Sequence, residues 1–274
     1  MDYLFLHRDK RTFTSERQRN LLFRAARLYW EQKYEGREPE KARKVDCELY
    51  KYVLYYSMSV WGGEWTCGIG CAVADRPEGP FKDCGMMFRS NGIKVQNSID
   101  PFYIEDNGHK YLFWGSFRGI YAIELSEDGL SLKSGSSPVQ IAGTAYEGTY
   151  IHKRGGYYYM FASIGSCCEG LKSTYTTVVG RATSLFGPYL DKKGQSMMDN
   201  HHEILIHKND SFVGTGHNSE IVSDNAGTDW LFYHAVSVAN PDGRVLMLDK
   251  IDWIDGWPSV EGNSPSVKSE KPRF

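Results

Sequence analysis

One short pattern recurs along the chain, and it limits the possible folds more than any other feature. Four segments are runs of aromatic and aliphatic residues that end in a small or polar one: KYVLYYS (51–57), KYLFWGS (110–116), YYYMFAS (157–163) and DWLFYHA (229–235). A fifth copy, DYLFLHR, occupies residues 2–8. Such runs are typical of β-strands. The second residue of each copy serves as its marker: Tyr3, Tyr52, Tyr111, Tyr158 and Trp230.

Three of the copies follow a second strand-like run and a tight turn. The turns are Asn-Gly at 107–108, Arg-Gly-Gly at 154–156 and Asp-Asn-Ala-Gly at 224–227, and such residues supply the positive φ angles that hairpins need. Five four-stranded units of roughly 50–60 residues each predict an all-β, five-bladed β-propeller. We expect it to form a single domain over residues 1–274. A β-sandwich is the competing fold, but it does not predict one hairpin recurring at this period.

The first 45 residues have a different residue pattern from the rest of the chain. Residues 15–36, SERQRNLLFRAARLYWEQKYEG, space their apolar side chains as a helix does. We therefore expect residues 1–45 to be an atypical part of blade one. They either carry a helical insertion or are a divergent stretch.

Composition excludes several classes of partner. The formal net charge is −2, so the chain lacks the basic excess typical of nucleic-acid binding. No apolar run approaches the ~20 residues of a membrane span, and no signal peptide is visible at the start. The cysteines form no C-x-x-C pair and are expected to be packing thiols. The adjacent Cys167 and Cys168 are not expected to bridge each other.

Three ionisable residues share one register across the hairpins. Asp100 and Glu147 each lie eleven residues before their markers, and His217 lies thirteen before its own. Alone, each has an ordinary explanation as a turn, solvent-facing or loop residue. In a propeller, however, the starts of the innermost strands converge around one mouth. Their shared register therefore predicts a site where two carboxylates meet, as general acid–base chemistry requires.

Four segments carry a resemblance to a known family. They are SIDPFYIEDNGHKYLFWGSFRGIYAIEL, EGTYIHKRGGYYYMFASIGSCCEGLKSTYTTVVGRATSLFGPYLDKKG, FVGTGHNSEIVSDNAGTDWLFYHA and DWIDGWPSV. Over roughly residues 50–274 the chain resembles glycoside hydrolase family 43, and within it the arabinan-degrading enzymes. The resemblance implies a five-bladed propeller. It also implies inverting hydrolysis of α-1,5-linked arabinofuranosyl bonds in arabinan.

The resemblance also implies roles for the three residues. Glu147 matches the general acid, and Asp100 matches the carboxylate that tunes its pKa and orients it. His217 matches a histidine that coordinates a metal ion in the central channel, for which Ca²⁺ is the usual occupant. Inversion places a water between acid and base, with the two carboxyl groups ~6.5–9.5 Å apart.

The family's general base is an aspartate in the first blade, and here the chain departs from the pattern. By register this residue would precede Met1, and the usual His-Asp-Pro signature is nowhere in the chain. Asp2, Asp9 and Asp46 do not fit the position. The expected consequence is impaired hydrolysis. Family members are often secreted or periplasmic, but the chain itself predicts no compartment.

Sugar-binding residues follow the strand ends. Trp61 in SVWGGEW and Phe117 in GSFRG are expected to stack on sugar rings or to pack between blades, and Arg244 is a candidate to reach the channel. We expect His201, His202 and Glu203 to form a solvated loop rather than a metal cluster.

The sequence alone is also compatible with other functions. The chain could be a non-catalytic carbohydrate-binding propeller or an interaction scaffold. It could also be a β-xylosidase or α-L-arabinofuranosidase on the same fold, because a fold alone does not fix the substrate. The sequence predicts no oligomeric state.

Overall fold

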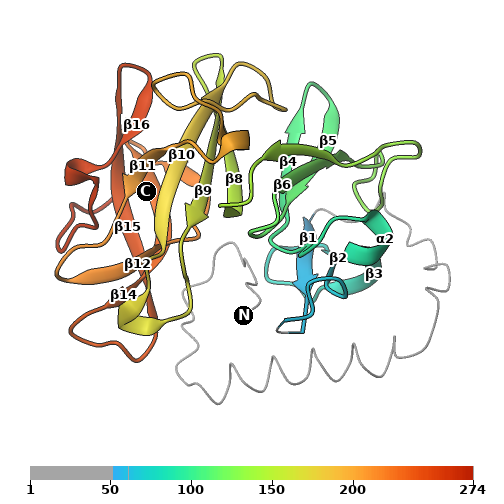
Figure 1. Cartoon of the computed structure of the whole chain (residues 1–274), viewed down its shortest axis with the longest axis horizontal. Coiled ribbons are helices and arrows are strands. Elements are labelled where there is room, and N and C mark those ends of the chain that lie inside the picture. Colours follow the sequence, from blue (N-terminus) through green and yellow to red (C-terminus); the bar gives the residue numbers. More distant parts are fainter. Residues whose placement is uncertain (1–51, 61, 274) are drawn as a thin grey trace.

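The structure is a computed structural model in which residues 52–60 and 62–273 are described (Figure 1). Several predictions lie outside this range. They are the fifth hairpin copy at 2–8, the helical stretch at 15–36, the atypical segment 1–45 and the side chain of Trp61.

Within the described residues the strands form four antiparallel sheets. The first sheet contains β1 (Tyr52–Met58), β2 (Gly68–Ala74) and β3 (Lys82–Arg89). The second contains β4 (Phe102–Asp106), β5 (His109–Trp114), β6 (Ile120–Glu124) and β7 (Val139–Ala142). The third contains β8 (Glu147–Arg154), β9 (Tyr157–Ile164), β10 (Thr176–Ala182) and β11 (Glu203–Ile206). The fourth contains β12 (Phe212–Gly216), β13 (Ile221–Ser223), β14 (Asp229–Ser237), β15 (Arg244–Ile254) and β16 (Trp257–Ser259).

Helical segments in this part of the chain are short. They are α2 (Ser90–Ile93), η2 (Gly170–Lys172), η3 (Met197–Asp199) and η4 (Glu261–Asn263). None of these helices is long and apolar enough to cross a bilayer.

The sheets follow one another along the chain as antiparallel meanders, which is the blade arrangement of a propeller (Figure 1). The all-β prediction and the propeller arrangement are confirmed, with four blades among the described residues. The expected hairpins are present as well. Asp106 pairs with His109 across a turn in which Asn107 and Gly108 have φ angles of 52° and 79°. Both central residues of this turn therefore need the left-handed region that Asn and Gly tolerate.

Apolar side chains fill the spaces between successive blades. One cluster, containing Ile69 and Trp114, joins the first two sheets, and a second, containing Phe113 and Met160, joins the next two. The third cluster, with Phe161 and Leu231, joins the last two. A fully buried side chain of this size contributes ~1.5–3 kcal/mol relative to exposure. This packing gives the strand starts a fixed framework.

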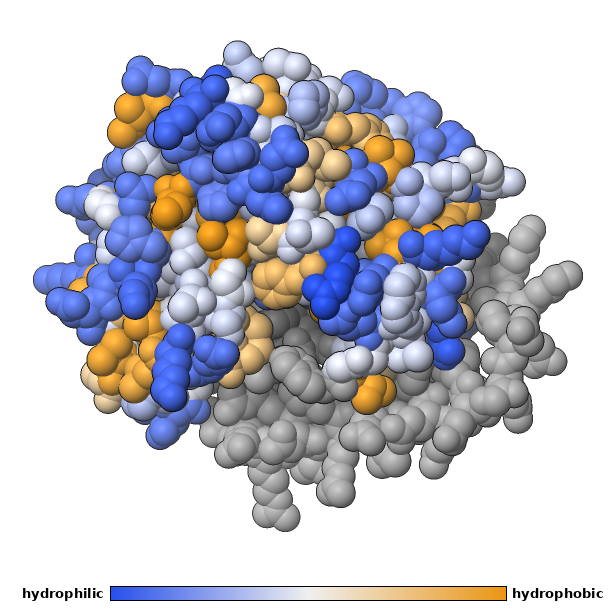
Figure 2. Space-filling view, in the orientation of Figure 1, coloured by the Kyte–Doolittle hydropathy of each residue, from blue (hydrophilic) through white to orange (hydrophobic). Residues whose placement is uncertain are grey.

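On the outside, the face drawn in Figure 2 mixes polar and apolar residues. The apolar ones gather in small separate patches between hydrophilic areas. The strands thus turn apolar side chains inward between blades and leave a mostly polar rim.

Candidate active site

The structure places the three predicted ionisable residues at strand starts and strand breaks. Glu147 is the first residue of β8, and Asp100 precedes the start of β4 by two residues. His217 differs from the expectation, because it follows β12 at a break before β13, and both strands pair with β14. Asp100 and His217 have positive φ angles of 59° and 48°. Such a conformation is uncommon for non-glycine residues and clusters at functional sites.

A buried serine in each of three hairpins holds the ionisable residue of the next. Ser57 is the last residue of its hairpin copy, and its Oγ accepts a hydrogen bond from the Asp100 N–H at 2.9 Å. Ser116 ends the following copy and donates from Oγ to Glu147 Oε2 at 2.7 Å. Each blade therefore fixes a strand start of its neighbour.

The third copy repeats the arrangement. Ser163 Oγ accepts a hydrogen bond from the His217 N–H at 2.7 Å, and Ser163 is completely buried. The sequence analysis did not single out these serines, although a serine is the last residue of three copies of the repeated segment. Two of these serines accept from a backbone N–H and one donates to a carboxylate, and the three contacts tie residues far apart in the sequence to one site.

Glu147 lies in an environment that favours its protonated form. Its side chain is buried, with 7% exposed. Burial raises the pKa of Glu147, and the negative charge of Asp100 raises it further. Hydrogen bonds from the Tyr175 and Ser116 hydroxyls oppose this rise in pKa, because they stabilise the carboxylate. A carboxyl group whose pKa is raised in this way has the property that a general acid needs.

The imidazole of His217 is held neutral beside this pair. Burial lowers the pKa of His217 to about 4, although the charge of Glu147 opposes the shift. The hydroxyl of Tyr175 lies 3.4 Å from His217 Nδ1 and also bonds to Glu147. Tyr175 therefore couples the predicted acid to the predicted metal ligand. It is buried to 1% exposure and was not anticipated from the sequence.

A cavity of about 320 Å³ reaches Asp100 and His217, while Glu147 and Tyr175 are not among its lining residues. Its lining includes Asp100, Gly148, Thr149, His217 and Asn218. Thr149 Oγ1 and Asn218 Oδ1 are buried and have no hydrogen-bond partner in the described part of the protein. Buried polar atoms of this kind call for a ligand, a water or an ion.

The residues that line the cavity determine whether the predicted metal ion could bind there. No group of three or more His, Cys, Asp or Glu residues with metal-binding geometry occurs within 52–60 and 62–273. A cation there would use the two unpaired oxygens and the neutral His217 ring, with water completing its shell. Oxygen donors suit Ca²⁺, so the residues present fit a water-rich calcium site.

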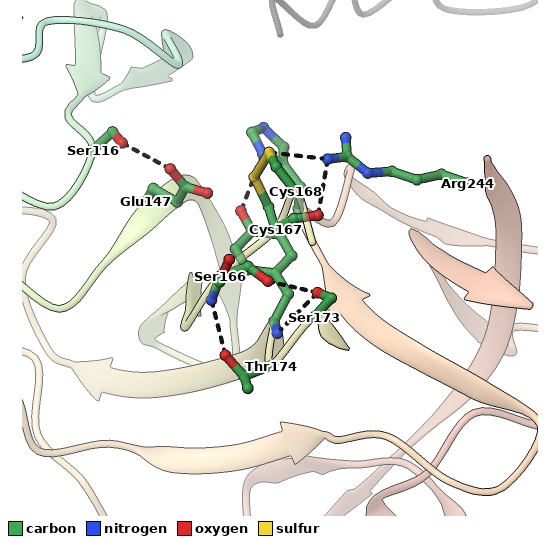
Figure 3. The surroundings of a disulfide bond; sticks show 10 residues. Ser116, Glu147, Ser166, Cys167, Cys168, Ser173, Thr174 and Arg244 are labelled. Atoms are coloured by element: carbon green, nitrogen blue, oxygen red, sulfur yellow. Dashed lines mark hydrogen bonds between the residues drawn. A yellow bond between two sulfur atoms is a disulfide. The ribbon is translucent and has the colours of Figure 1, made fainter. Parts of the chain in front are cut away.

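The predicted sugar-binding residues have different surroundings. Phe117 is half-buried and its N–H donates to the carbonyl of Tyr146 at 2.9 Å, so it lies beside Glu147. Arg244 opens β15, and its Nη2 donates to the Cys167 carbonyl at 3.0 Å and approaches Cys168 Sγ at 3.4 Å (Figure 3). Trp61 lies outside the described residues.

Two expectations about side chains need correction. Cys167 and Cys168 form a disulfide, with their Cα atoms 3.8 Å apart (Figure 3), so the prediction that adjacent cysteines would not bridge was wrong. Cys67 and Cys71 are buried thiols, as expected. His202 is not fully solvated, because its Nδ1 lies 3.1 Å from the Tyr146 hydroxyl.

Comparisons with known proteins identify the same family that the sequence resembles. The family model described as "Glycosyl hydrolases family 43" matches residues 26–258. An extracellular endo-alpha-(1->5)-L-arabinanase of Bacillus subtilis is 36% identical over 243 residues, covering 85% of this chain and 72% of that protein. An extracellular exo-alpha-(1->5)-L-arabinofuranosidase of Cellvibrio japonicus is 34% identical, covering 82% of this chain and 75% of that protein.

Solved structures agree with these sequence matches. The alpha-L-arabinanase of Cellvibrio cellulosa aligns with a TM-score of 0.71 at 32% identity, covering 82% of each chain. The endo-arabinanase of Bacillus licheniformis aligns with a TM-score of 0.67 at 34% identity, covering 76% of this chain and 72% of that one.

Proposed function

The chain belongs to glycosyl hydrolase family 43, and from that premise we propose that it hydrolyses α-1,5-linked L-arabinofuranosyl bonds of arabinan with inversion. The observation that carries this proposal is the buried Glu147 carboxyl, whose pKa is raised by burial and by Asp100. Relatives that match over most of their length are arabinan-cleaving enzymes by name, and one structural neighbour was solved with arabinohexaose. These relatives favour an enzyme over a binding-only propeller.

In the proposed reaction Glu147 acts while protonated. It donates its proton to the glycosidic oxygen as the bond from that oxygen to the anomeric carbon breaks. The negative charge of Asp100 raises the pKa of Glu147 and so favours the proton on Glu147 until that moment. Ser116 and Tyr175 then stabilise the carboxylate that remains, because both hydroxyls bond to it.

Inversion also requires a carboxylate base that activates water on the opposite face of the sugar. We assign no residue of the described range to that role. The proposal therefore has two separable parts, recognition of arabinan and its cleavage, and they can be measured separately.

We further propose that the propeller has five blades. The four described sheets account for four copies of the hairpin pattern, and the fifth copy at 2–8 supports one more.

We also propose a cation in the cavity beside His217, with Asn218 Oδ1 and Thr149 Oγ1 facing its shell. A bound Ca²⁺ would supply fixed positive charge at the base of the site. The test is thermal unfolding in EGTA and in CaCl₂. A rise in Tm with calcium that disappears in Asn218→Ala supports the site, and identical curves for the unaltered protein contradict it.

The function is tested by incubating the protein with linear arabinan and with xylo-oligosaccharides and separating the products by chromatography. We expect arabino-oligosaccharides from the first and no products from the second. The size distribution distinguishes internal from terminal cleavage. Faster cleavage of the xylose substrate would overturn the assignment.

Calorimetric titration with arabinohexaose separates recognition from cleavage. Binding without product formation would show that recognition holds and that the base is not supplied by this chain. Neither binding nor cleavage would refute the proposal as a whole.

A further inference from the structure

The disulfide between the neighbouring residues Cys167 and Cys168 takes no part in the proposed proton transfer from Glu147. It lies in the segment between β9 and η2, and Cys167 is half-buried while Cys168 is exposed, so part of the disulfide is accessible. A disulfide carries no hydrogen-bond donor, and with its two flanking methylene groups it presents an apolar surface.

The segment that carries the disulfide is fixed in place from several directions. Arg244 donates to the Cys167 carbonyl at 3.0 Å. The Ser166 N–H donates to Thr174 Oγ1 at 3.0 Å, and Ser173 Oγ donates to the Ser166 carbonyl at 2.5 Å. Such contacts give the disulfide a defined position rather than that of a mobile loop tip.

That position is next to the predicted general acid. Glu147 pairs directly with Ser163 across β8 and β9, shortly before Cys167 in the chain. The same segment leads into Tyr175, whose hydroxyl bonds to Glu147. Figure 3 shows the disulfide flanked by Glu147 on one side and by Arg244 on the other.

The hairpin register shows what the disulfide replaces. Phe117 is the third residue after the end of β5, and Trp61 is the third after the end of β1. Cys167 is the third residue after the end of β9. Counted from the serine that ends each copy, however, Cys167 and Trp61 are both the fourth residue and Phe117 is the first, so the disulfide shares its register with a large aromatic residue in one other copy.

We propose that the Cys167–Cys168 disulfide is part of the substrate-binding surface and packs against the apolar face of an arabinofuranosyl ring bound beside Glu147. Phe117, which adjoins Glu147 through Tyr146, would contact the sugar chain from the neighbouring blade. Arg244 acts here as a positioning residue that holds the disulfide. This inference rests on the proposed function, because it takes the same sugar as ligand.

Binding rather than turnover tests the inference. Glu147→Gln serves as the parent, so that the sugar is not consumed, and arabinohexaose is titrated into it by calorimetry. Adding Cys167→Ser and Cys168→Ser together removes the disulfide. We expect the dissociation constant to rise about tenfold, which corresponds to losing on the order of 55 Å² of apolar contact. Cys84→Ser, which removes a half-buried thiol of the first sheet, is the matched control and should leave the affinity unchanged.

A second measurement does not depend on the fold of a variant. With cysteine β-carbons labelled in the parent protein, the bound sugar should show intermolecular nuclear Overhauser effects to Cys167 or Cys168. Binding by the parent without these contacts, or with unchanged affinity in a folded double-serine variant, overturns the inference alone. A folded parent that does not bind arabinohexaose at all contradicts the proposed function, and the inference with it.

Discussion

Replacing Ser116 by alanine isolates one contact that sets the state of Glu147. The hydroxyl donates to Glu147 Oε2 at 2.7 Å, and the two residues are 3% and 7% exposed. A hydrogen bond to a charged group contributes about 1.5–3 kcal/mol, against about 0.5–1.5 kcal/mol for a neutral pair. The loss in unfolding free energy should therefore be larger where Glu147 is ionised.

The sign follows from the protons bound in each state. The pKa of Glu147 is already raised by burial and by Asp100, so above the ordinary glutamate pKa the folded state binds more protons than the unfolded state. The free energy of unfolding then falls as the pH rises through that window. Removing the Ser116 donor raises the pKa of Glu147 further and steepens the fall.

The assay is guanidinium chloride denaturation at about pH 4, below the ordinary glutamate pKa, and at about pH 8. The control is Ser98→Ala, because the hydroxyl of this buried serine bonds to two neutral groups, the Val95 carbonyl and the Trp114 indole. We expect the loss of unfolding free energy to depend on pH for Ser116→Ala and to be nearly the same at both pH values for Ser98→Ala. Equal losses of Ser116→Ala at both pH values would refute the reasoning.

Two further substitutions test the same site. Asp100→Asn should lower the pKa of Glu147 only in part, because burial, the larger cause of the raised pKa, remains. The alkaline limb of the pH–activity profile should therefore move to lower pH. A shift of that limb to higher pH would contradict the assigned roles. Gly148→Ala should lower Tm by about 2–8 °C, since alanine at positive φ costs ~1–2 kcal/mol and its Cβ would lie 3.0 Å from His217 Nδ1. Gly155→Ala, also at positive φ but with open space around it, gives the backbone cost alone, and an equal Tm loss would show that the His217 contact is unimportant.

Much of the framework could be predicted because it is local. The aromatic runs and the Asn107-Gly108 turn encode hairpins within a few residues, and their repetition encodes blades. The register of Asp100 and Glu147 was visible for the same reason, since equivalent residues of repeats lie at equivalent places.

The remaining features depend on contacts between distant segments. The bridge between Cys167 and Cys168 forms in a segment anchored by Arg244, 77 positions along the chain from Cys167. Tyr175 was likewise hidden, because only the folded sheets bring its hydroxyl to Glu147 and His217. His217 was misplaced relative to its strand because the run before the turn at 224–227 forms two strands rather than one, with β12 ending at Gly216 and β13 beginning at Ile221.

The central claim is that Glu147 supplies the proton to the leaving group, and leaving-group dependence tests it most directly. Activity of the protein and of Glu147→Gln is compared on linear arabinan and on a dinitrophenyl α-L-arabinofuranoside, whose leaving group needs no protonation. We predict a loss of about 10²–10⁴-fold on arabinan and a much smaller loss on the activated substrate. Equal losses on both substrates, or none on arabinan, would contradict the account.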